Sequence, residues 1–399
     1  MKTIILAAGR GKNLNPLTET RPKPMLSICG KPVLEYIVQG LVDTGNRDII
    51  MVVGHHAQKI KQYFERGERF GASIQYIEQE QQTGIGNAVL LTQEKFVPGE
   101  RFFLVYADIL FESNIFSKTL ETFNLKLAPV ASITLTPKIH PYYGNVSINE
   151  HIGITRIADH LSEEQAGSYV LAGVFIFDYT LFEHLQRANG DMNAAFEQIV
   201  QQQGLFGSIF QDEWIDLGYP WNVLDANRFL MKSFHHATIA SSVKFEGNVT
   251  INGPVQIGED VTIGGGSIIQ GPCYIGRGTY VGNNVLVRKN TSIGAESVIG
   301  FGVELRNCVL FDKVRVGRLS FIGDSVVGEE VEIGSGIMTV NNLMTGETVK
   351  VKINGEPVDS GLIKLGSFIG DRTKVGASNT LAPGAVIPSG RFVPHHVSL

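Results

Sequence analysis

An aliphatic residue recurs at every sixth position through a long stretch in the second half of the chain. Ten such positions follow one another without a break: Ile251, Ile257, Ile263, Ile269, Ile275, Val281, Val287, Ile293, Ile299 and Leu305. Neither an α-helix, with about 3.6 residues per turn, nor a strand with alternating faces has this period. It is typical of a hexapeptide-repeat solenoid, in which each face of a triangular coil directs one aliphatic side chain inward. The sequence therefore predicts a β-helix here.

The repeat continues toward the C-terminus with interruptions. Phe311 is expected to keep the spacing, which then slips by one residue on two occasions. The later positions are Val316, Ile322, Val327 and Ile333 and, after a gap, Ile369, Val375, Leu381, Ile387 and Val393. The gap, residues 339–366, is charged and contains glycine, so we expect a loop extruded from the coil.

The first part of the chain has a different pattern, in which short apolar runs alternate with amphipathic segments. The predicted strands are residues 3–8, 49–53, 73–77, 101–106, 130–136, 145–149 and 169–177, and the predicted helices are residues 31–44, 58–64, 87–95, 179–188, 194–203 and 222–234. Such alternation predicts a mostly parallel sheet covered by helices. We therefore expect an α/β domain over residues 1–230 and a β-helix domain over residues 231–399.

Glycines follow the first predicted strand directly. The run from Thr3 to Ala8 is apolar and ends in small residues, as in a strand buried on both faces, and Gly9 and Gly11 come next. Glycines at this place let the backbone amides approach a phosphate at the carboxyl end of a central strand. The Walker pattern is absent, and Leu14 stands where a dinucleotide fingerprint needs its third glycine.

Composition excludes several classes of partner. The 34 basic and 39 acidic residues give a net charge of −5 without long runs of either sign, so we expect neither nucleic acid nor an anionic membrane as a partner. No apolar stretch approaches the roughly 20 residues of a membrane span, and the apolar N-terminus is too short for a signal peptide. Three cysteines without metal-ligand spacing predict reduced, mostly buried thiols in a cytoplasmic protein.

The glycine loop resembles that of the sugar-phosphate nucleotidylyltransferases. The matching residues are Leu6–Gly9, Gly11, Pro16–Thr18 and Pro22–Pro24. With the hexapeptide repeats, the whole chain resembles archaeal-type bifunctional sugar-1-phosphate nucleotidylyltransferase/acetyltransferases, such as glucosamine-1-phosphate uridylyltransferase/acetyltransferases. This resemblance implies a Rossmann-like nucleotidyltransferase domain, a left-handed β-helix and a homotrimer formed through the β-helix.

The resemblance also implies the site residues. Because nucleotidyl transfer concentrates negative charge on phosphates, such a site needs Mg²⁺ and fixed cations. The implied catalytic residues are Lys23, Asp108 and Asp216, with Asp108 and Asp216 as the Mg²⁺ ligands. The implied nucleotide-binding residues are Leu6, Ala8, Gly9, Gly11, Lys12, Asn13, Gln79 and Gly84, and the implied sugar-binding residues are Gly144 and Asp159. A glutamine amide at position 79 can pair with uracil or thymine, which favours UTP or dTTP.

Three positions depart from the family pattern in this first site. Asn13 replaces an arginine that would stabilise the triphosphate, Ile85 replaces a threonine, and Leu171 replaces an asparagine near the sugar. Loss of one such cation in phosphoryl transfer can lower the rate on the order of 10³-fold.

The expected acetyltransferase site in the β-helix departs further. Arg318 stands at the position of the catalytic histidine and Phe321 at that of a tyrosine, whereas Asn341 is retained. Arginine stays protonated and cannot act as a base, so acetyl transfer is not expected.

Two functions stay open. The first is an enzyme that joins an NTP to a sugar 1-phosphate with release of pyrophosphate. The second is a regulatory protein of the same fold that binds a nucleotide or a nucleotide sugar without turnover. The sequence names neither the base nor the sugar.

Overall fold

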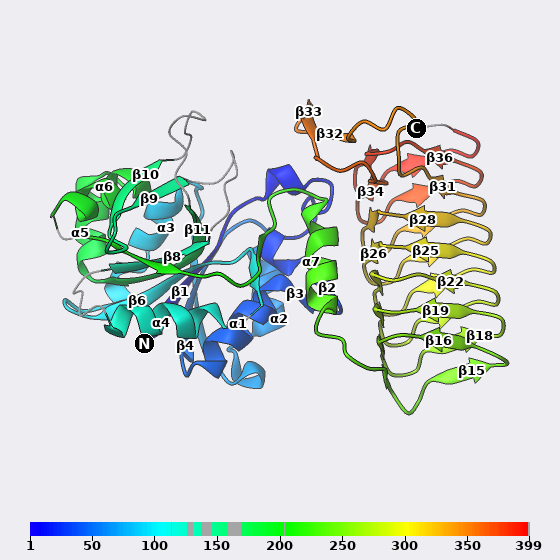
Figure 1. Cartoon of the computed structure of the whole chain (residues 1–399), viewed down its shortest axis with the longest axis horizontal. Helices are drawn as coiled ribbons and strands as arrows, with labels where there is room; N and C mark the ends of the chain where they lie inside the picture. Colours follow the sequence, from blue (N-terminus) through cyan, green and yellow to red (C-terminus); the bar gives the residue numbers. More distant parts are fainter. Residues whose placement is uncertain (113, 126–130, 137–144, 159–168, 203, 398–399) are drawn as a thin grey trace. The chain divides into compact units, whose positions relative to one another are not determined.

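The chain packs into two compact units (Figure 1). The computed structural model describes all residues except 113, 126–130, 137–144, 159–168, 203 and 398–399. The first unit consists of Met1–Arg10, Pro22–Met25 and Val33–Asp216, and the second of Gly11–Arg21, Leu26–Pro32 and Leu217–Leu399. The segment after the glycine loop thus packs with the C-terminal half of the chain. The predicted domain boundary at residue 230 stays a prediction.

The first unit is built on a mixed sheet with the order β10-β9-β11-β6-β1-β4-β5. Its parallel centre consists of β6 (Arg101–Tyr106), β1 (Lys2–Ala7), β4 (Asp48–Val53) and β5 (Ser73–Glu78). The antiparallel side is formed around β11 (Tyr169–Asp178) by β8 (Ala131–Thr136), β9 (Asn145–Ile148) and β10 (Ile154–Ala158), and β12 (Phe206–Ile209) runs parallel to β8. The predicted parallel nucleus is confirmed, and the sheet as a whole is mixed.

Helices cover both faces of this sheet. The helices are α1 (Val33–Asp43), α2 (Ala57–Phe64), α3 (Ile85–Leu90), α4 (Ile115–Leu125), α5 (Thr180–Arg187) and α6 (Met192–Gln202). Side chains of α1, α2 and α4 belong to one apolar cluster, and those of α3, α5 and α6 belong to another. Ile5 of β1 lies in the first cluster and Ile4 in the second, because successive side chains of a strand point to opposite faces. This is the strand buried on both faces that the sequence predicts.

The second unit contains a β-helix of three parallel sheets with eight, eight and seven strands. The first β-helix sheet consists of β14 (Thr238–Ile239), β17 (Val255–Ile257), β20 (Cys273–Ile275), β23 (Thr291–Ile293), β26 (Val309–Leu310), β29 (Val326–Val327), β34 (Phe368–Ile369) and β37 (Val386–Ile387). The second consists of β15 (Lys244–Glu246), β18 (Thr262–Gly264), β21 (Tyr280–Val281), β24 (Val298–Ile299), β27 (Arg315–Val316), β30 (Glu332–Ile333), β35 (Lys374–Val375) and β38 (Phe392–Val393). The third consists of β16 (Thr250–Asn252), β19 (Ile268–Gln270), β22 (Leu286–Val287), β25 (Glu304–Arg306), β28 (Phe321–Gly323), β31 (Met338–Thr339) and β36 (Thr380–Leu381).

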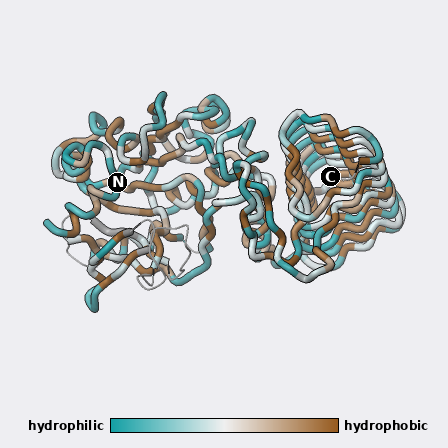
Figure 2. Tube along the Cα trace, turned by 90° about the horizontal axis from the view of Figure 1, so that it is seen from above, coloured by the Kyte–Doolittle hydropathy of each residue, from teal (hydrophilic) through white to brown (hydrophobic). Residues whose placement is uncertain are grey.

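The repeat positions form the interior of the β-helix, whose coils stack over one another in Figure 2. Each predicted aliphatic position from Ile257 to Leu305 is buried in one continuous cluster, and Ile251 packs against its end. This confirms the solenoid. Its left-handed winding stays a prediction from the resemblance.

The predicted place of Phe311 is wrong. Leu310 is the inward residue of β26, since it pairs with Ile293 in one neighbouring strand and Val327 in the other. The spacing therefore slips one six-residue repeat earlier than expected, between Leu305 and Leu310. Phe311 is 2% exposed but does not belong to the interior cluster. Its ring instead contacts the guanidinium of Arg21, 4.9 Å from the ring centroid.

The extruded segment contains an antiparallel hairpin, β32 (Lys350–Ile353) and β33 (Glu356–Asp359). Next to the β-helix, the second unit also contains α7 (Asn222–Met231) and the two-stranded β2 (Ser27–Ile28) and β3 (Lys31–Pro32). The amide of Asn227 in α7 donates a hydrogen bond to the carbonyl of Asn290, at 2.8 Å.

The exclusions drawn from composition can be compared with the structure. Within the described part of the chain, none of the helices has the length and apolar composition needed to cross a membrane. Cys29, Cys273 and Cys308 are buried free thiols, as predicted. Burial raises the pKa of Cys273 to about 12, so this thiol stays protonated and unreactive.

Candidate functional site

Lys23 lies between two carboxylates that come from distant parts of the chain. Its ammonium forms an ion pair with Asp108 and lies 3.7 Å from Oδ1 of Asp216. Asp108 follows β6 and directly precedes β7 (Ile109–Phe111), which pairs antiparallel with β13 (Trp214–Asp216). Asp216 stands opposite Ile109 in this pairing, so the hydrogen-bonded ribbon brings the two aspartates together. These three side chains are the catalytic residues that the resemblance implies.

The charges of this cluster are not balanced. Burial alone would lower the pKa of the Lys23 ammonium, but the carboxylates of Asp108 and Asp216 outweigh it and raise the pKa above its ordinary value. Oδ1 of Asp108 is buried and has no hydrogen-bond partner among the residues that the structure describes. A buried carboxylate oxygen without a donor is costly unless something positive occupies the place. The cluster is therefore arranged to accept a further cation.

Three strand ends of the parallel sheet meet beside the glycine loop. A side chain added at Gly54, after β4, would come within 3.0 Å of the carbonyl of Ala8 and 3.2 Å of that of Gln79. Glycine at position 54 thus permits the ends of β1, β4 and β5 to approach closely. Gly9 faces open space, with nothing within 4 Å of the place where a side chain would start. This edge is where open α/β sheets bind ligands.

The predicted base-reading residues are placed by the loop after β5. The side-chain amide of Gln79 is buried and donates to the carbonyl of Gly84 at 3.1 Å, and Gln82 donates to the carbonyl of Ala8 at 2.8 Å. Gly84 has a φ of +105°, which favours glycine, and it also faces open space. Gln79, Gly84 and Ala8 therefore belong to one connected group, and Ile85 beside them is exposed.

The remaining nucleotide-loop residues belong to the second unit. Gly11 has a φ of +62°, and Lys12 and Asn13 lie in the short helical turn that follows. Both Lys12 and Asn13 are exposed. Oδ1 of Asn13 accepts a hydrogen bond from the side chain of Asn354, at the tip of the β32–β33 hairpin, at 2.9 Å. Where the family pattern has a cation, this chain has a neutral amide that is paired with a second amide.

The other predictions for this site have different outcomes. Gly144 and Asp159 lie outside the described residues, so their sugar-binding role stays a prediction. Leu171 of β11 is half-buried against one apolar cluster, as is Leu6 of β1. The nucleotide-binding role of Leu6 stays a prediction.

The acetyltransferase positions form no reactive group. Arg318 is exposed, and the ring of Phe321 lies across Gly323, 2.5 Å from where a side chain there would start. The amide of Asn341 donates to Asp324 at 2.6 Å, and Asp324 also accepts from Asn307 at 2.6 Å. The retained asparagine is thus engaged in a row of hydrogen bonds at the strand ends of the third β-helix sheet. These hydrogen bonds give Asn341 a structural role that does not depend on acetyl transfer.

Sequence reasoning missed several residues around the site. Gly54 and Gln82 carry no motif, and only the fold reveals their contacts. His55 lies in the turn after β4, where its backbone N–H donates to the carbonyl of Ala8 at 3.4 Å, and burial together with the charges of His56 and Arg10 lowers the pKa of its imidazole. Arg21 stands inside the Arg-Pro-Lys-Pro motif and received no role. The sequence alone does not show that Arg21 is buried, and only the structure reveals its carboxylate partners.

Comparisons with known proteins agree with this geometry. A family model described as nucleotidyl transferase matches residues 2–233, and one described as the GMPPB C-terminal domain matches residues 269–356. "Bifunctional protein GlmU" of Methanococcus maripaludis strain C7 is 38% identical over 402 residues, covering 98% of this chain and 93% of that protein. "Bifunctional sugar-1-phosphate nucleotidylyltransferase/acetyltransferase" of Sulfurisphaera tokodaii is 30% identical over 395 residues, covering 97% of this chain and 94% of that protein.

A solved structure shares the fold of the first part. UDP-glucose pyrophosphorylase from Acinetobacter baumannii matches with a TM-score of 0.52 and 19% identity, covering 58% of this chain and 94% of that one. The family model spans more than half of the chain, and the GlmU-like relatives span nearly all of it. The chain is thus a member of the nucleotidyl transferase family, within the group of sugar-1-phosphate nucleotidylyltransferases.

Proposed function

We propose that this protein joins an NTP, UTP or dTTP, to a sugar 1-phosphate in a Mg²⁺-dependent reaction that releases pyrophosphate. The observation that carries the proposal is the convergence of Asp108 and Asp216 on Lys23. Transfer of a nucleotidyl group needs charge stabilisation and positioning more than covalent catalysis, and this cluster supplies both signs of charge.

The residues present fit a divalent cation. Oδ1 of Asp108 is buried without a donor, and carboxylate oxygens are the ligands that Mg²⁺ prefers. Among the described residues no group of three or more His, Cys, Asp or Glu side chains forms a closed metal site. This suits Mg²⁺, which keeps waters and takes its other ligands from phosphates. Asp108 and Asp216 would hold the ion, which would neutralise phosphate charge when bound.

Lys23 has the role of a fixed cation beside the phosphates. Its raised pKa keeps the ammonium charged throughout the physiological range, so it needs no proton transfer to act. The sugar-phosphate oxygen attacks the α-phosphorus of the NTP, the bond to the β-phosphate oxygen breaks, and pyrophosphate leaves. A positive charge held at this place favours both the bound triphosphate and the departing pyrophosphate.

Nucleotide recognition falls to the loops at the strand ends. Gly9 and Gly84 leave room for a ligand to approach the backbone, and Gly11 and Lys12 continue the same loop. The Gln79 side chain, held by Gly84, presents its amide oxygen for a uracil or thymine imide. This is why we propose UTP or dTTP. Gly144 and Asp159 are proposed for the sugar.

One observation favours the alternative function. Asn13 supplies no cation and already pairs with Asn354. A chain of this fold that binds a nucleotide or nucleotide sugar without turnover would serve as a regulatory protein. Acetyl transfer is not proposed, since Arg318 offers no base.

Release of pyrophosphate separates the two functions. The purified protein is incubated with Mg²⁺, each of UTP, dTTP, GTP, CTP and ATP, and a panel of sugar 1-phosphates. We expect release with UTP or dTTP and at least one sugar phosphate. Nucleotide-dependent thermal stabilisation with no release for any pair would support the regulatory function instead.

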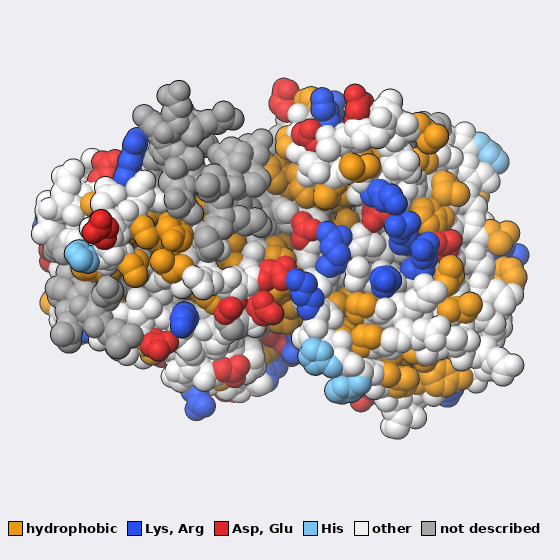
Figure 3. All heavy atoms as spheres, viewed as in Figure 1, with side chains coloured by type: hydrophobic (Ala, Val, Ile, Leu, Met, Phe, Trp, Pro, Cys, Tyr) orange, Lys and Arg blue, Asp and Glu red, His pale blue; other side chains and the backbone are white. Residues whose placement is uncertain are grey.

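We also propose a cytoplasmic homotrimer formed through the β-helix. The third β-helix sheet and its border expose large apolar side chains, with Ile268 at 39%, Phe301 at 50%, Leu319 at 63% and Met338 at 47%. Figure 3 shows basic side chains among the apolar ones on the face that carries β22, β25 and β28. Light scattering of the double variant Phe301→Asp, Leu319→Asp tests this, with dissociation expected. Unchanged mass would contradict it.

A further inference from the structure

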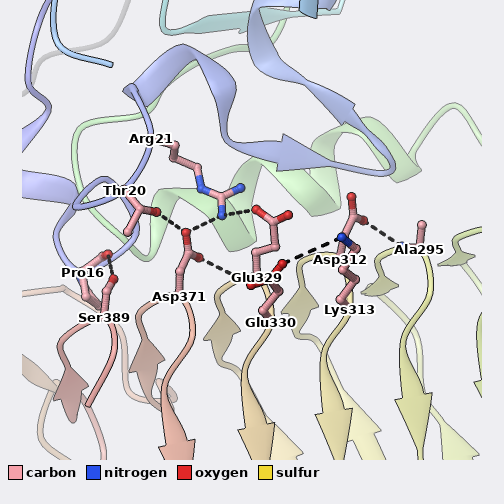
Figure 4. Close-up of polar contacts among 10 residues, drawn as sticks. All are labelled: Pro16, Thr20, Arg21, Ala295, Asp312, Lys313, Glu329, Glu330, Asp371 and Ser389. Atoms are coloured by element: carbon pink, nitrogen blue, oxygen red, sulfur yellow. Dashed lines mark hydrogen bonds and ion pairs between the residues drawn. The ribbon is translucent and has the colours of Figure 1, made fainter. Parts of the chain in front are cut away.

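Arg21 is buried in the second unit with two carboxylates of the β-helix. Its Nη2 lies 2.5 Å from Oδ2 of Asp371 and 2.9 Å from Oε2 of Glu329, and Arg21 is 6% exposed (Figure 4). Phe311, the residue that leaves the interior pattern, covers the face of the guanidinium. Burying an arginine is costly unless both charge and hydrogen bonds are supplied. Two turns of the coil supply both to Nη2 through Asp371 and Glu329, whereas Nε of Arg21 is buried without a hydrogen-bond partner among the described residues.

These turns occupy one corner of the β-helix. Asp312, Glu329, Asp371 and Ser389 each stand two residues after a strand of the first β-helix sheet, so they follow one another along the stack in Figure 4. Backbone hydrogen bonds of 2.7–3.0 Å connect the successive turns. The corner is therefore a row of polar side chains in which three carboxylates accept hydrogen bonds and Ser389 donates them.

Asp371 is fully engaged at this corner. Its Oδ1 accepts the backbone N–H of Glu329 at 2.7 Å, and its Oδ2 accepts hydrogen bonds from Arg21 and from the hydroxyl of Thr20. Asp371 is 3% exposed. A carboxylate with this many donors has one preferred orientation, so it can hold Arg21 in one place.

Other contacts fix the rest of the segment from residue 11 to residue 21. The backbone N–H of Ser389 donates to the carboxylate of Glu19 at 2.7 Å, and the hydroxyl of Ser389 donates to the carbonyl of Pro16 at 3.4 Å. At the other end of the segment, Asn354 donates to Asn13. Residues 11–21, which form the second half of the nucleotide loop after β1, are thus attached to the β-helix at several points. Arg21 makes the buried, charged contact among them.

We propose that the Arg21–Asp371–Glu329 cluster is a positioning device for nucleotidyl transfer, through which the β-helix holds the nucleotide loop in its active conformation. The inference rests on the proposed function. Lys23 follows Arg21 by two residues, and two residues of chain span at most about 7 Å. Pro22 between them restricts the backbone further. Fixing Arg21 therefore limits where the Lys23 backbone can lie, and a catalytic group displaced by about 1 Å can lose on the order of 10²-fold in rate.

The test compares neighbouring glutamates on the same turn. Glu329→Gln and Asp371→Asn weaken the cluster, and Glu330→Gln is the matched control, because Glu330 pairs only at 3.8 Å with the exposed Lys313. Pyrophosphate release is measured well below each melting temperature. We expect Glu329→Gln and Asp371→Asn to lower kcat about 10- to 100-fold with little change in KM for the sugar phosphate, while Glu330→Gln keeps the wild-type kcat.

A second readout does not depend on turnover. Hydrogen–deuterium exchange of peptides covering residues 11–21 should become faster in Glu329→Gln and Asp371→Asn and stay at the wild-type rate in Glu330→Gln. Arg21→Lys, which keeps the charge, should recover part of the protection that Arg21→Met loses. Unchanged exchange in the cluster variants, or unchanged kcat with a lower melting temperature, would overturn the inference. If the wild-type protein releases no pyrophosphate, the proposed function fails, and the exchange experiment still decides whether the cluster holds the loop.

Discussion

Arg21 and Lys23 are separated by one proline, and each lies between two carboxylates, but Asp371 and Asp108, the main carboxylate partners, differ in how completely their oxygens accept hydrogen bonds. Arg21 is 6% exposed, and both oxygens of its partner Asp371 accept hydrogen bonds. The side chain of Lys23 is 17% exposed, and one oxygen of its partner Asp108 has no donor in the described part of the chain.

The difference indicates different roles. A buried carboxylate whose two oxygens both accept hydrogen bonds, as in Asp371, holds a conformation, because moving a charged partner leaves a buried charge unpaired. A carboxylate that keeps a buried oxygen without a donor, as in Asp108, carries a local cost that a bound cation can offset. The Arg21–Asp371–Glu329 cluster is therefore suited to positioning, and the Lys23–Asp108–Asp216 cluster is suited to catalysis. Asp324 in the β-helix resembles Asp371, because its two oxygens accept hydrogen bonds from Asn307 and Asn341. This agrees with the loss of the acetyltransferase base at Arg318.

The largest expected effect is on turnover, from a substitution in the Lys23–Asp108–Asp216 cluster. Asp108→Asn keeps the shape of the side chain but removes a carboxylate that would hold the cation. Pyrophosphate release should fall on the order of 10³-fold, while the melting temperature stays close to that of the wild type. Asp260→Asn, an exposed turn residue, is the control. A stable Asp108→Asn variant with wild-type turnover would make Asp108 an ordinary strand-end residue.

The next effect is on stability, and the loss of stability should be larger for substitution of Arg21 than for substitution of Lys23. Arg21→Met leaves Asp371 buried with its strongest partner removed and should lower the free energy of unfolding by about 3 kcal/mol. Lys23→Met leaves two carboxylates that solvent can reach and should cost clearly less. Urea denaturation of both variants measures the difference. Equal losses would show that the clusters are not distinct in the way described.

A smaller effect is expected where the chain departs from the family pattern. Asn13→Arg restores a cation on the nucleotide loop and should raise turnover on the order of tenfold. Asn354→Ala is the control, because it breaks the Asn13–Asn354 hydrogen bond without adding charge. Steady-state kinetics with UTP and dTTP check this. No gain would mean that residue 13 does not correspond to the family arginine.

The smallest effect is on the pH dependence of stability, and it concerns Asp312 beside the Arg21–Asp371–Glu329 cluster. Burial, with the nearby charge of Glu329, raises the pKa of its carboxyl although the N–H of Ala295 and the charge of Arg21 oppose the shift. The charged form therefore costs stability at neutral pH, and this cost disappears as pH falls through the raised pKa toward 3.8. Asp312→Asn should melt slightly higher than the wild type at pH 7 and equally near pH 4. A lower melting temperature at pH 7 would contradict this.

The strong periodic signals predicted the fold well. The six-residue spacing gave the β-helix interior, and the apolar run before Gly9 gave a central strand with both faces buried. The slip at Leu310 was misplaced because Phe311 is equally apolar, and only the contact with Arg21 shows that it faces outward. The helix α4 was not predicted, since its Thr, Ser and Asn residues weaken local helix propensity and packing decides the outcome.

The site was only partly predictable for a related reason. Lys23, Asp108 and Asp216 came from motifs, and their convergence depends on the β7–β13 ribbon, whose strands are too short to be detected by pattern. Contacts such as Gln82 with Ala8 or Asn354 with Asn13 join residues far apart in sequence through ordinary polar groups. No local pattern distinguishes such residues from solvated ones.

The central claim is that Asp108 and Asp216 together hold one divalent ion, and direct binding of Mn²⁺ tests it. Mn²⁺ serves as a paramagnetic substitute for Mg²⁺, titrated with a non-hydrolysable UTP or dTTP analogue and followed by electron paramagnetic resonance. We predict one protein-dependent ion in the wild type and in Asp260→Asn, and weakening of at least about tenfold in both Asp108→Asn and Asp216→Asn. Binding that is unchanged in either aspartate variant would contradict the account.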